Sequence, residues 1–272
     1  AGRLRATAET VYPSQRHSGL EEIVARFVED QPREDATAAC FGIAGPIQGG
    51  RVATPNLPWV IEAASLARLL RIDTVELIND LEANAWGVPA LAPDDFLCLN
   101  AGRPNPGNAA VISAGTGLGQ AGLYWNGITH RPFATEGGHC DFAPRNELEF
   151  ELLRHLAERI GRVSVERIVS GPGLVSIYRF FQERDPAEEP AAFARELREG
   201  DPAAAIWRAA VNGESAIAAR AVDLFVELYG AEAGNLALKM LATAGVYVGG
   251  GIAPKIAGRL REGTFLRAFT DK

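Results

Sequence analysis

The stretch ISAGTGLGQAGLYWNG, residues 112–127, decides the fold of this chain. It carries the spacing G-x-G-x-x-G at Gly117, Gly119 and Gly122. In dinucleotide-binding folds this spacing follows a strand and opens a helix that holds a pyrophosphate, so an NAD-dependent oxidoreductase is one interpretation. The residues that flank the glycines decide whether that interpretation is right.

The flanking residues are typical of strands on both sides. Residues 108–114 predict a strand before the glycines, and residues 123–125 are strand formers after them. Asn126-Gly127 is a strong signal for a hairpin turn, and residues 128–133 can return as the partner strand. We therefore expect a strand–loop–strand unit with the glycines at its bend. Such a loop can still hold phosphate, because backbone N–H groups converge on an anion and Thr116 adds a hydroxyl donor.

A second glycine cluster lies near the C-terminus. Gly249, Gly250 and Gly251 separate an apolar predicted strand, residues 244–248, from a predicted helix, residues 253–260. Taken alone, this cluster is as well explained by a tight turn as by a close approach to a nucleotide. Together the two clusters favour a nucleoside triphosphate over NAD.

Composition and charge exclude several classes of protein. Hydrophobic residues make up 47% and charged residues 22% of the chain, which is ordinary for a folded domain. A net charge of −7 without a long basic run argues against a nucleic-acid partner and favours a small molecule. No apolar run approaches the ~20 residues that span a bilayer, so we expect no membrane partner. Cys40, Cys98 and Cys140 are isolated, and we expect reduced thiols in a cytoplasmic protein.

The order of predicted elements is that of an α/β protein with a mainly parallel sheet covered by helices. We expect a small α/β domain over residues 1–90 and a large α/β domain over residues 91–272, with a helical section at about 146–242. In the small domain the pattern predicts strands over 3–12, 36–45 and 73–78, the second of them buried, and helices over 19–30, 62–72 and 79–87.

Five polar residues could hold and activate a polyol. Asp80 follows a predicted strand and could act as a general base, with Asn79 beside it as a hydrogen-bonding group; helix capping is the alternative for both. Glu136 and His139 flank two glycines and could take a pair of hydroxyl groups. A metal site and an incidental surface loop are the alternatives for that pair. Glu166 lies in the first turn of a predicted helix, where an acid is favoured in any case.

These motifs together resemble the bacterial glucokinase family of the hexokinase and actin-like ATPase superfamily. The resemblance covers nearly the whole chain in order, and EGGHCDFAP followed by ERIVSGPGL is its most specific part. The matching stretches are FGIAGPI at 41–47, TPNLPW at 54–59, LINDLEANAWG at 77–87, GTGLGQAGL at 115–123, EGGHCDFAP at 136–144, VSVERIVSGPGL at 163–174 and VYVGGGIAPK at 246–255.

The resemblance implies a two-domain actin-like ATPase (ribonuclease H-like) fold and phosphorylation of glucose to glucose 6-phosphate by ATP with Mg²⁺. It makes Asp80 the catalytic base and implies a homodimer. In the family an Asp of the first phosphate loop helps to place magnesium, and no residue of this chain is assigned as a metal ligand. It assigns sugar binding to Asn56, Asn79, Asp80, Glu136, His139 and Glu166, with Trp59 nearby. It assigns the phosphate loop to Gly115, Thr116, Gly117 and Gly119, and the adenosine motif to Gly249, Gly250 and Gly251.

The chain departs from the family pattern at both ends. The family opens with a strand, a D-x-G-G-T-x-x-R turn and a second strand, and no such motif occurs here. We therefore expect an incomplete small domain that lacks this first phosphate loop, and a chain that stops before the family's closing elements. A non-catalytic sugar-binding or regulatory protein and a catalytically incomplete fragment stay open as alternatives. The related repressor group is disfavoured, because a cysteine-rich zinc cluster follows its E-x-G-H motif whereas Cys140 stands alone.

Overall fold

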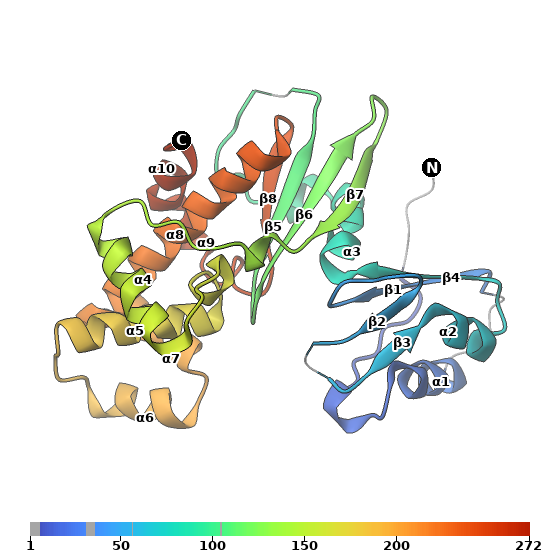
Figure 1. Ribbon diagram of the computed structural model, residues 1–272, viewed down its shortest axis with the longest axis horizontal. Helices are drawn as coiled ribbons and strands as arrows, with labels where there is room; N and C mark the ends of the chain where they lie inside the picture. The colour runs from blue at the N-terminus through green and yellow to red at the C-terminus, as the bar shows by residue number, and fades with distance from the viewer. Residues whose placement is uncertain (1–5, 31–35, 56, 104) are drawn as a thin grey trace. The chain divides into compact units, whose positions relative to one another are not determined.

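The computed structural model describes residues 6–30, 36–55, 57–103 and 105–272, which fold as a mixed α/β protein (Figure 1). The chain forms two compact units, Ala1–Asp95 and Phe96–Lys272. Each unit is described by itself. None of the described helices is long and apolar enough to cross a membrane.

The first unit is built from two small sheets and three α-helices in its described residues. The parallel strands β1 (Ala38–Ile43) and β4 (Thr74–Asn79) place Ile43 opposite Asn79, and β2 (Arg51–Ala53) pairs antiparallel with β3 (Val60–Glu62). A small apolar core is formed by Val24, Val52, Trp59, Ile61, Leu66 and Leu77. The elements are η1 (Ser14–Arg16), α1 (Leu20–Asp30), β1 (Ala38–Ile43), β2 (Arg51–Ala53), β3 (Val60–Glu62), α2 (Ala63–Leu70), β4 (Thr74–Asn79), α3 (Asp80–Gly87), η2 (Val88–Ala90) and η3 (Pro93–Asp95).

Two predictions for the first unit are wrong. Residues 6–12, the described part of the strand expected at 3–12, form no strand and are almost all exposed. Alternation alone does not make a strand, because a strand needs a neighbour for its backbone hydrogen bonds, and none of the described strands pairs with this segment. The strand at 36–45 exists as β1, but its residues alternate between exposed and half-buried. It is not buried because, among the described residues, it has one neighbour, β4.

The second unit contains a four-stranded sheet in the order β7-β6-β5-β8 (Figure 1). Its strands are β5 (Ala109–Ala114), β6 (Leu118–Trp125), β7 (His130–Thr135) and β8 (Gly245–Gly249). β6 pairs antiparallel with both β5 and β7, whereas β8 pairs parallel with β5. The antiparallel pairings agree with the hairpin predicted for these residues. The mainly parallel sheet, predicted from the alternation of elements in the first part of the chain, has one parallel pair among the described residues there, β1–β4, beside the antiparallel pair β2–β3.

The glycine fingerprint lies in a strand–loop–strand unit, as expected, but of its three glycines only Gly117 lies at the bend. Gly119 and Gly122 are strand residues of β6, so no helix follows the loop and the NAD-dependent oxidoreductase interpretation is wrong. A Cβ at position 122 would lie 2.1 Å from the ring of Phe133, so the third glycine of the fingerprint serves packing. The hairpin turn forms where Asn126 accepts hydrogen bonds from the next backbone N–H groups and Gly127 takes φ +93°.

Helices make up most of the rest of the second unit. The long helix α8 packs against β5 and β8 and also contacts α5, α7 and α10, so it lies at the centre of the apolar core. The elements are η4 (Gly137–His139), α4 (Glu147–Ile160), η5 (Val165–Arg167), α5 (Gly171–Arg184), α6 (Ala191–Glu199), α7 (Pro202–Val211), α8 (Ala216–Met240), α9 (Ala257–Arg261) and α10 (Thr264–Thr270).

Candidate functional site

The loop between β5 and β6 is short and tied down at both ends. The backbone N–H of Gly115 donates to the carbonyl of Gly117 at 2.8 Å, and the N–H of Gly171 donates to the carbonyl of Gly115 at 2.8 Å. No other atom lies within 4 Å of a Cβ placed on Gly115, so a ligand can reach its backbone. Of the expected phosphate-loop residues, Gly119 lies outside this loop, within β6 and opposite Ser113.

The second glycine cluster lies beside the start of that loop. β8 ends at Gly249, which is opposite Ser113, and the N–H of Ile252 donates to the carbonyl of Ala114 at 3.2 Å. Gly250 has φ +84°, and a Cβ there would lie 2.4 Å from the same carbonyl, so only glycine fits. The parallel pairing of β5 and β8 thus brings two clusters together that are far apart in the sequence.

The helix expected at 253–260 begins later than predicted. Residues 250–256 form turns, and α9 spans only Ala257–Arg261. The glycines therefore do not open directly into a helix. No helix N-terminus that could bind phosphate therefore lies directly next to these glycines. A ligand could instead contact the backbone of the turn, because a Cβ built on Gly249 or Gly251 has no other atom within 4 Å.

Glu136 and His139 lie at the two ends of a one-turn 3-10 helix, η4, with Glu136 as its N-cap and His139 as its last residue. Their side chains face each other, with His139 Nε2 3.8 Å from Glu136 Oε2, and both are more than half exposed. The two intervening glycines pack tightly on β6: a Cβ on Gly138 would lie 2.0 Å from the carbonyl of Leu118. The turn can therefore present its carboxylate and imidazole to solvent while its backbone stays against the sheet.

Glu166 joins this turn to the glycine loop. It lies on η5, a 3-10 turn rather than the expected α-helix. Its Oε2 accepts a hydrogen bond from the N–H of Leu118 at 2.9 Å, and its Oε1 lies 3.8 Å from His139 Nδ1. A Cβ on Gly117 would lie 2.5 Å from Oε2, so the loop needs glycine there for this contact. Three predicted sugar-binding residues and the predicted phosphate loop thus form one continuous surface.

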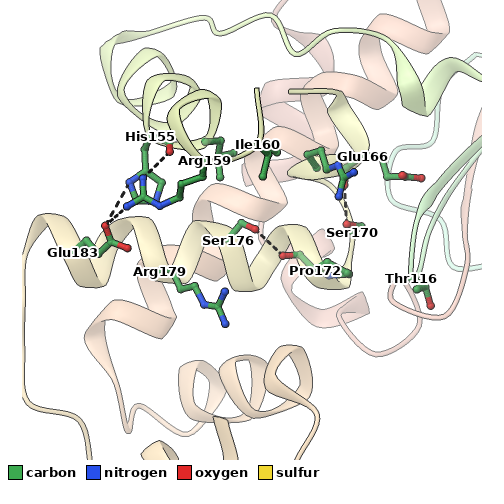
Figure 2. Close-up of a pocket in the computed structure, with 12 residues that line it drawn as sticks. Thr116, His155, Arg159, Ile160, Glu166, Ser170, Pro172, Ser176, Arg179 and Glu183 are labelled. Atoms are coloured by element: carbon green, nitrogen blue, oxygen red, sulfur yellow. Dashed lines mark hydrogen bonds and ion pairs between the residues drawn. The ribbon is translucent and has the colours of Figure 1, made fainter. Parts of the chain in front are cut away.

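A hollow of about 380 Å³ adjoins this surface (Figure 2). Thr116 and Glu166 line one end of it, and α4 and α5 form its walls. At its far end Arg159 pairs with Glu183, and His155 lies 3.9 Å from the same carboxylate. Burial, together with the positive charge of Arg159, lowers the pKa of His155 below its ordinary value of 6.5.

Asn79 and Asp80 belong to the first unit, at the end of β4 and the start of α3. The side chain of Asn79 is buried and caps α3 by accepting the N–H of Leu81 at 2.9 Å. Asp80 Oδ1 accepts the same N–H at 3.0 Å. The capping alternative is therefore confirmed for Asn79. Because Asp80 bonds to the N–H of Leu81 through Oδ1, its second oxygen is available for chemistry at the C-terminal end of the parallel strand β4.

Two further expected residues are not placed at the site. Asn56 lies outside the described residues. Trp59 is buried in the apolar core of the first unit and shares it with Val52 and Ile61. Its position accounts for a tryptophan there through packing alone.

The described residues contain no cluster of three or more metal-ligating side chains. The metal-site alternative for Glu136 and His139 has no such cluster to support it among these residues. Cys40, Cys98 and Cys140 are exposed and free of disulfides.

Sequence reasoning missed the residues that support the site from beneath. Gln120 and Glu232 are buried and hydrogen-bonded to each other below the turn, and Tyr229 bridges the ends of β5 and β8. Arg162 donates to the carbonyl of His139 at 2.5 Å and to Asp141 at 2.7 Å. Gln120 gave no signal, because it lies between Gly119 and Gly122, where a bend was expected, whereas the structure places it within β6.

Comparison with known proteins gives one family. The sequence model of the family described as glucokinase matches residues 2–272. A glucokinase of Nostoc sp. (strain PCC 7120 / SAG 25.82 / UTEX 2576) is 46% identical over 248 residues, which cover 86% of this chain and 72% of that protein.

The fold is also similar to that of solved structures. A glucokinase from an Antarctic psychrotroph superposes with a TM-score of 0.80 at 30% identity, covering 96% of this chain and 79% of that one. A ROK family glucokinase from Streptomyces griseus in complex with glucose and AMPPNP has a TM-score of 0.60 at 21% identity, covering 92% of this chain and 78% of that one. At that identity the second similarity concerns the fold.

Proposed function

This chain belongs to the glucokinase family, and we propose that it transfers the γ-phosphoryl group of ATP to the 6-hydroxyl group of glucose. One observation carries the assignment to this site: Glu166 contacts the N–H of Leu118 and lies within 3.8 Å of His139. A group that holds sugar hydroxyls is thereby attached to a loop suited to phosphate.

In the proposed reaction Asp80 acts as the general base. Its carboxylate takes the proton of the 6-hydroxyl as the sugar oxygen bonds to the γ-phosphorus, and the bond to the β-phosphate oxygen breaks to release ADP. The family motifs that these residues match assign the remaining hydroxyl groups to Asn79 of the first unit and to Glu136, His139 and Glu166 of the second. Carboxylates accept hydroxyl hydrogens, whereas the amide and imidazole can donate or accept, so this set can orient a polyol.

ATP would use the exposed backbone of the two glycine segments. The open space at Gly115 lets phosphate oxygens approach the loop, where the hydroxyl of Thr116 is the donor, because the N–H of Gly115 is already bonded to the carbonyl of Gly117. Gly249 and Gly251 leave open space for the nucleoside. Mg²⁺ bound to the phosphates supplies charge neutralisation.

We further propose a homodimer in the cytoplasm. Closed two-fold assemblies are the commonest oligomers of soluble enzymes, and three free exposed thiols suit a reducing compartment. Light scattering coupled to size exclusion tests the dimer.

A titration experiment tests the function. Glucose is titrated calorimetrically into the wild-type chain and into Asp80→Asn and Glu136→Gln, and ADP release is followed in parallel. We expect Asp80→Asn to bind glucose but to lose about 10²–10⁴ in turnover, and Glu136→Gln to lose affinity. Binding by the wild type without ADP release would instead favour a sugar-binding protein, and no binding by a folded chain would refute the site.

A further inference from the structure

A buried carboxylate lies beneath the turn that carries Glu136 and His139. Glu232 of α8 is 4% exposed, and its Oε1 accepts a hydrogen bond from Nε2 of Gln120 at 2.8 Å. Gln120 itself is 1% exposed. A charged group is rarely buried to this extent without a specific partner, so the pair calls for an explanation beyond packing.

Further contacts fix the orientation of the Glu232 carboxylate. Its Oε2 accepts from Asn235 Nδ2 at 3.0 Å, and Asn235 in turn accepts from Lys272 Nζ at 2.8 Å. Lys239 Nζ lies 3.6 Å from Oε1. Both oxygens of Glu232 are thus occupied, which sets the amide of Gln120 in one orientation, with its nitrogen toward α8.

The opposite end of the Gln120 amide packs on the turn. A Cβ on Gly137 would lie 2.1 Å from Oε1 of Gln120, so the amide oxygen lies directly against this backbone. The turn is tied to the same residue by Thr135, whose hydroxyl donates to the carbonyl of Gln120 at 3.1 Å and accepts the N–H of Gly137 at 3.3 Å. The position of Gln120 therefore limits where η4 can lie.

We propose that Glu232 and Gln120 are positioning residues that set the affinity for the sugar by fixing the turn from Glu136 to His139. Neither residue is exposed, so both act through the turn rather than on the ligand. The inference rests on the proposed function for the identity of the sugar, but the mechanical link from α8 to the turn is independent of it. A displacement of the turn by a fraction of an ångström misaligns two hydrogen-bonding groups at once.

The same helix supplies a matched control. Tyr229 is fully buried one helical turn earlier, but its hydroxyl contacts the other half of the site. It accepts the N–H of Ala114 at 3.2 Å and lies 3.4 Å from the carbonyl of Gly249, at the start of the two glycine segments. Tyr229→Phe therefore disturbs α8 to a similar degree without touching the turn.

The test exchanges the two polar partners. Gln120→Glu opposes two carboxylates, whereas the double variant Gln120→Glu with Glu232→Gln restores one donor facing one acceptor and keeps an oxygen against Gly137. We expect Gln120→Glu to raise the KM for glucose by about tenfold while the KM for ATP changes by less than about twofold. We expect the double variant to recover most of the loss, and Tyr229→Phe to affect the KM for ATP instead.

Hydrogen exchange of the free protein separates this inference from the proposed function. The N–H groups of His139 and Cys140 bond back to Glu136 and Gly137. We expect them to exchange faster in Gln120→Glu and to regain protection in the double variant, whether or not glucose is the substrate. Equal rises in both KM values, or a folded double variant without recovery, would overturn the proposal. If the wild type did not phosphorylate glucose but the exchange results were as expected, the proposed function alone would be refuted.

Discussion

Glu166 and Leu118 are joined by a hydrogen bond of 2.9 Å from the backbone N–H of Leu118 to Oε2 of Glu166. Leu118 is the first residue of β6, directly after the glycine loop. The other carboxylate oxygen of Glu166 faces His139. One side chain therefore serves the predicted sugar site and the predicted phosphate loop.

Two substitutions of Glu166 should separate these roles. Glu166→Gln keeps an oxygen that can accept the N–H of Leu118, so we expect a higher KM for glucose and an unchanged KM for ATP. Glu166→Ala leaves this N–H without its partner, and we expect both KM values to rise. Steady-state kinetics with each substrate varied in turn measures the difference. Identical profiles for the two variants would contradict the dual role.

Substitution by alanine should have different effects at two glycines of the site, on stability at one and on ATP binding at the other. In Gly138→Ala the new methyl would meet the backbone carbonyl of Leu118 at 2.0 Å, which cannot move aside as a side chain can. We expect a loss of about 1–3 kcal/mol in the free energy of unfolding. Gly115→Ala meets no atom within 4 Å, so we expect stability to be unchanged and the KM for ATP to rise. Urea denaturation and kinetics of both variants check this, and an unaltered KM for ATP would argue against nucleotide phosphate at Gly115.

Asn79 should have a structural and a binding role that can be separated. Asn79→Asp keeps the oxygen that caps α3 and adds a charge that a helix N-terminus favours, but it loses the 3.5 Å hydrogen bond from the Asn79 amide to the carbonyl of Gly45, so we expect a smaller loss of stability than in Asn79→Ala. It removes the amide N–H groups, and we expect weaker glucose binding. Asn79→Ala loses the cap as well and should cost about 1 kcal/mol of stability. Calorimetry and thermal unfolding of the pair distinguish the two roles; full glucose affinity in Asn79→Asp would leave the capping role alone.

His155 should make stability depend on pH. Because burial lowers its pKa, the unfolded chain binds a proton at this residue more readily than the folded one. The contribution of His155 to the free energy of unfolding is therefore complete above the ordinary pKa of 6.5 and is lost as pH falls below that value. The ring packs edge-on against Phe180 at 5.3 Å, so His155→Phe can keep the packing without the charge. Between about pH 7.5 and 5.5 we expect the free energy of unfolding of His155→Phe, measured by urea denaturation, to fall less than that of the wild type. Parallel curves would contradict this.

Local signals made much of the fold predictable. The Asn126-Gly127 turn and the strand formers before it identified β6 correctly, although a dinucleotide fingerprint runs through the same residues. The capping pattern at Asn79 likewise predicted the start of α3. In both places the preference of a few neighbouring residues agrees with the tertiary structure.

Contacts between distant residues were not predictable in this way. The contact of Glu166 with Leu118 and that of Gln120 with Glu232 join positions separated by 48 and 112 residues. No periodicity encodes such pairs. The strand expected at 3–12 failed for a related reason, since alternation describes a chain that could pair but not whether a partner is there. The helix predicted directly after Gly251 failed because residues 250–256 are used to bring the chain back against Ala114.

The parallel pairing of β5 with β8 has a consequence for the order in which the protein is made. β5, β6 and β7 are contiguous hairpins and can form as soon as they leave the ribosome. β8 must wait until the whole helical section has been synthesised, because it follows α8. The turn from Glu136 to His139, for which we propose sugar binding, can therefore be assembled while Gly249 and Gly250 are still untranslated. During that interval one edge of β5 is open, which makes the nascent chain most exposed to mispairing just before its nucleotide half is completed.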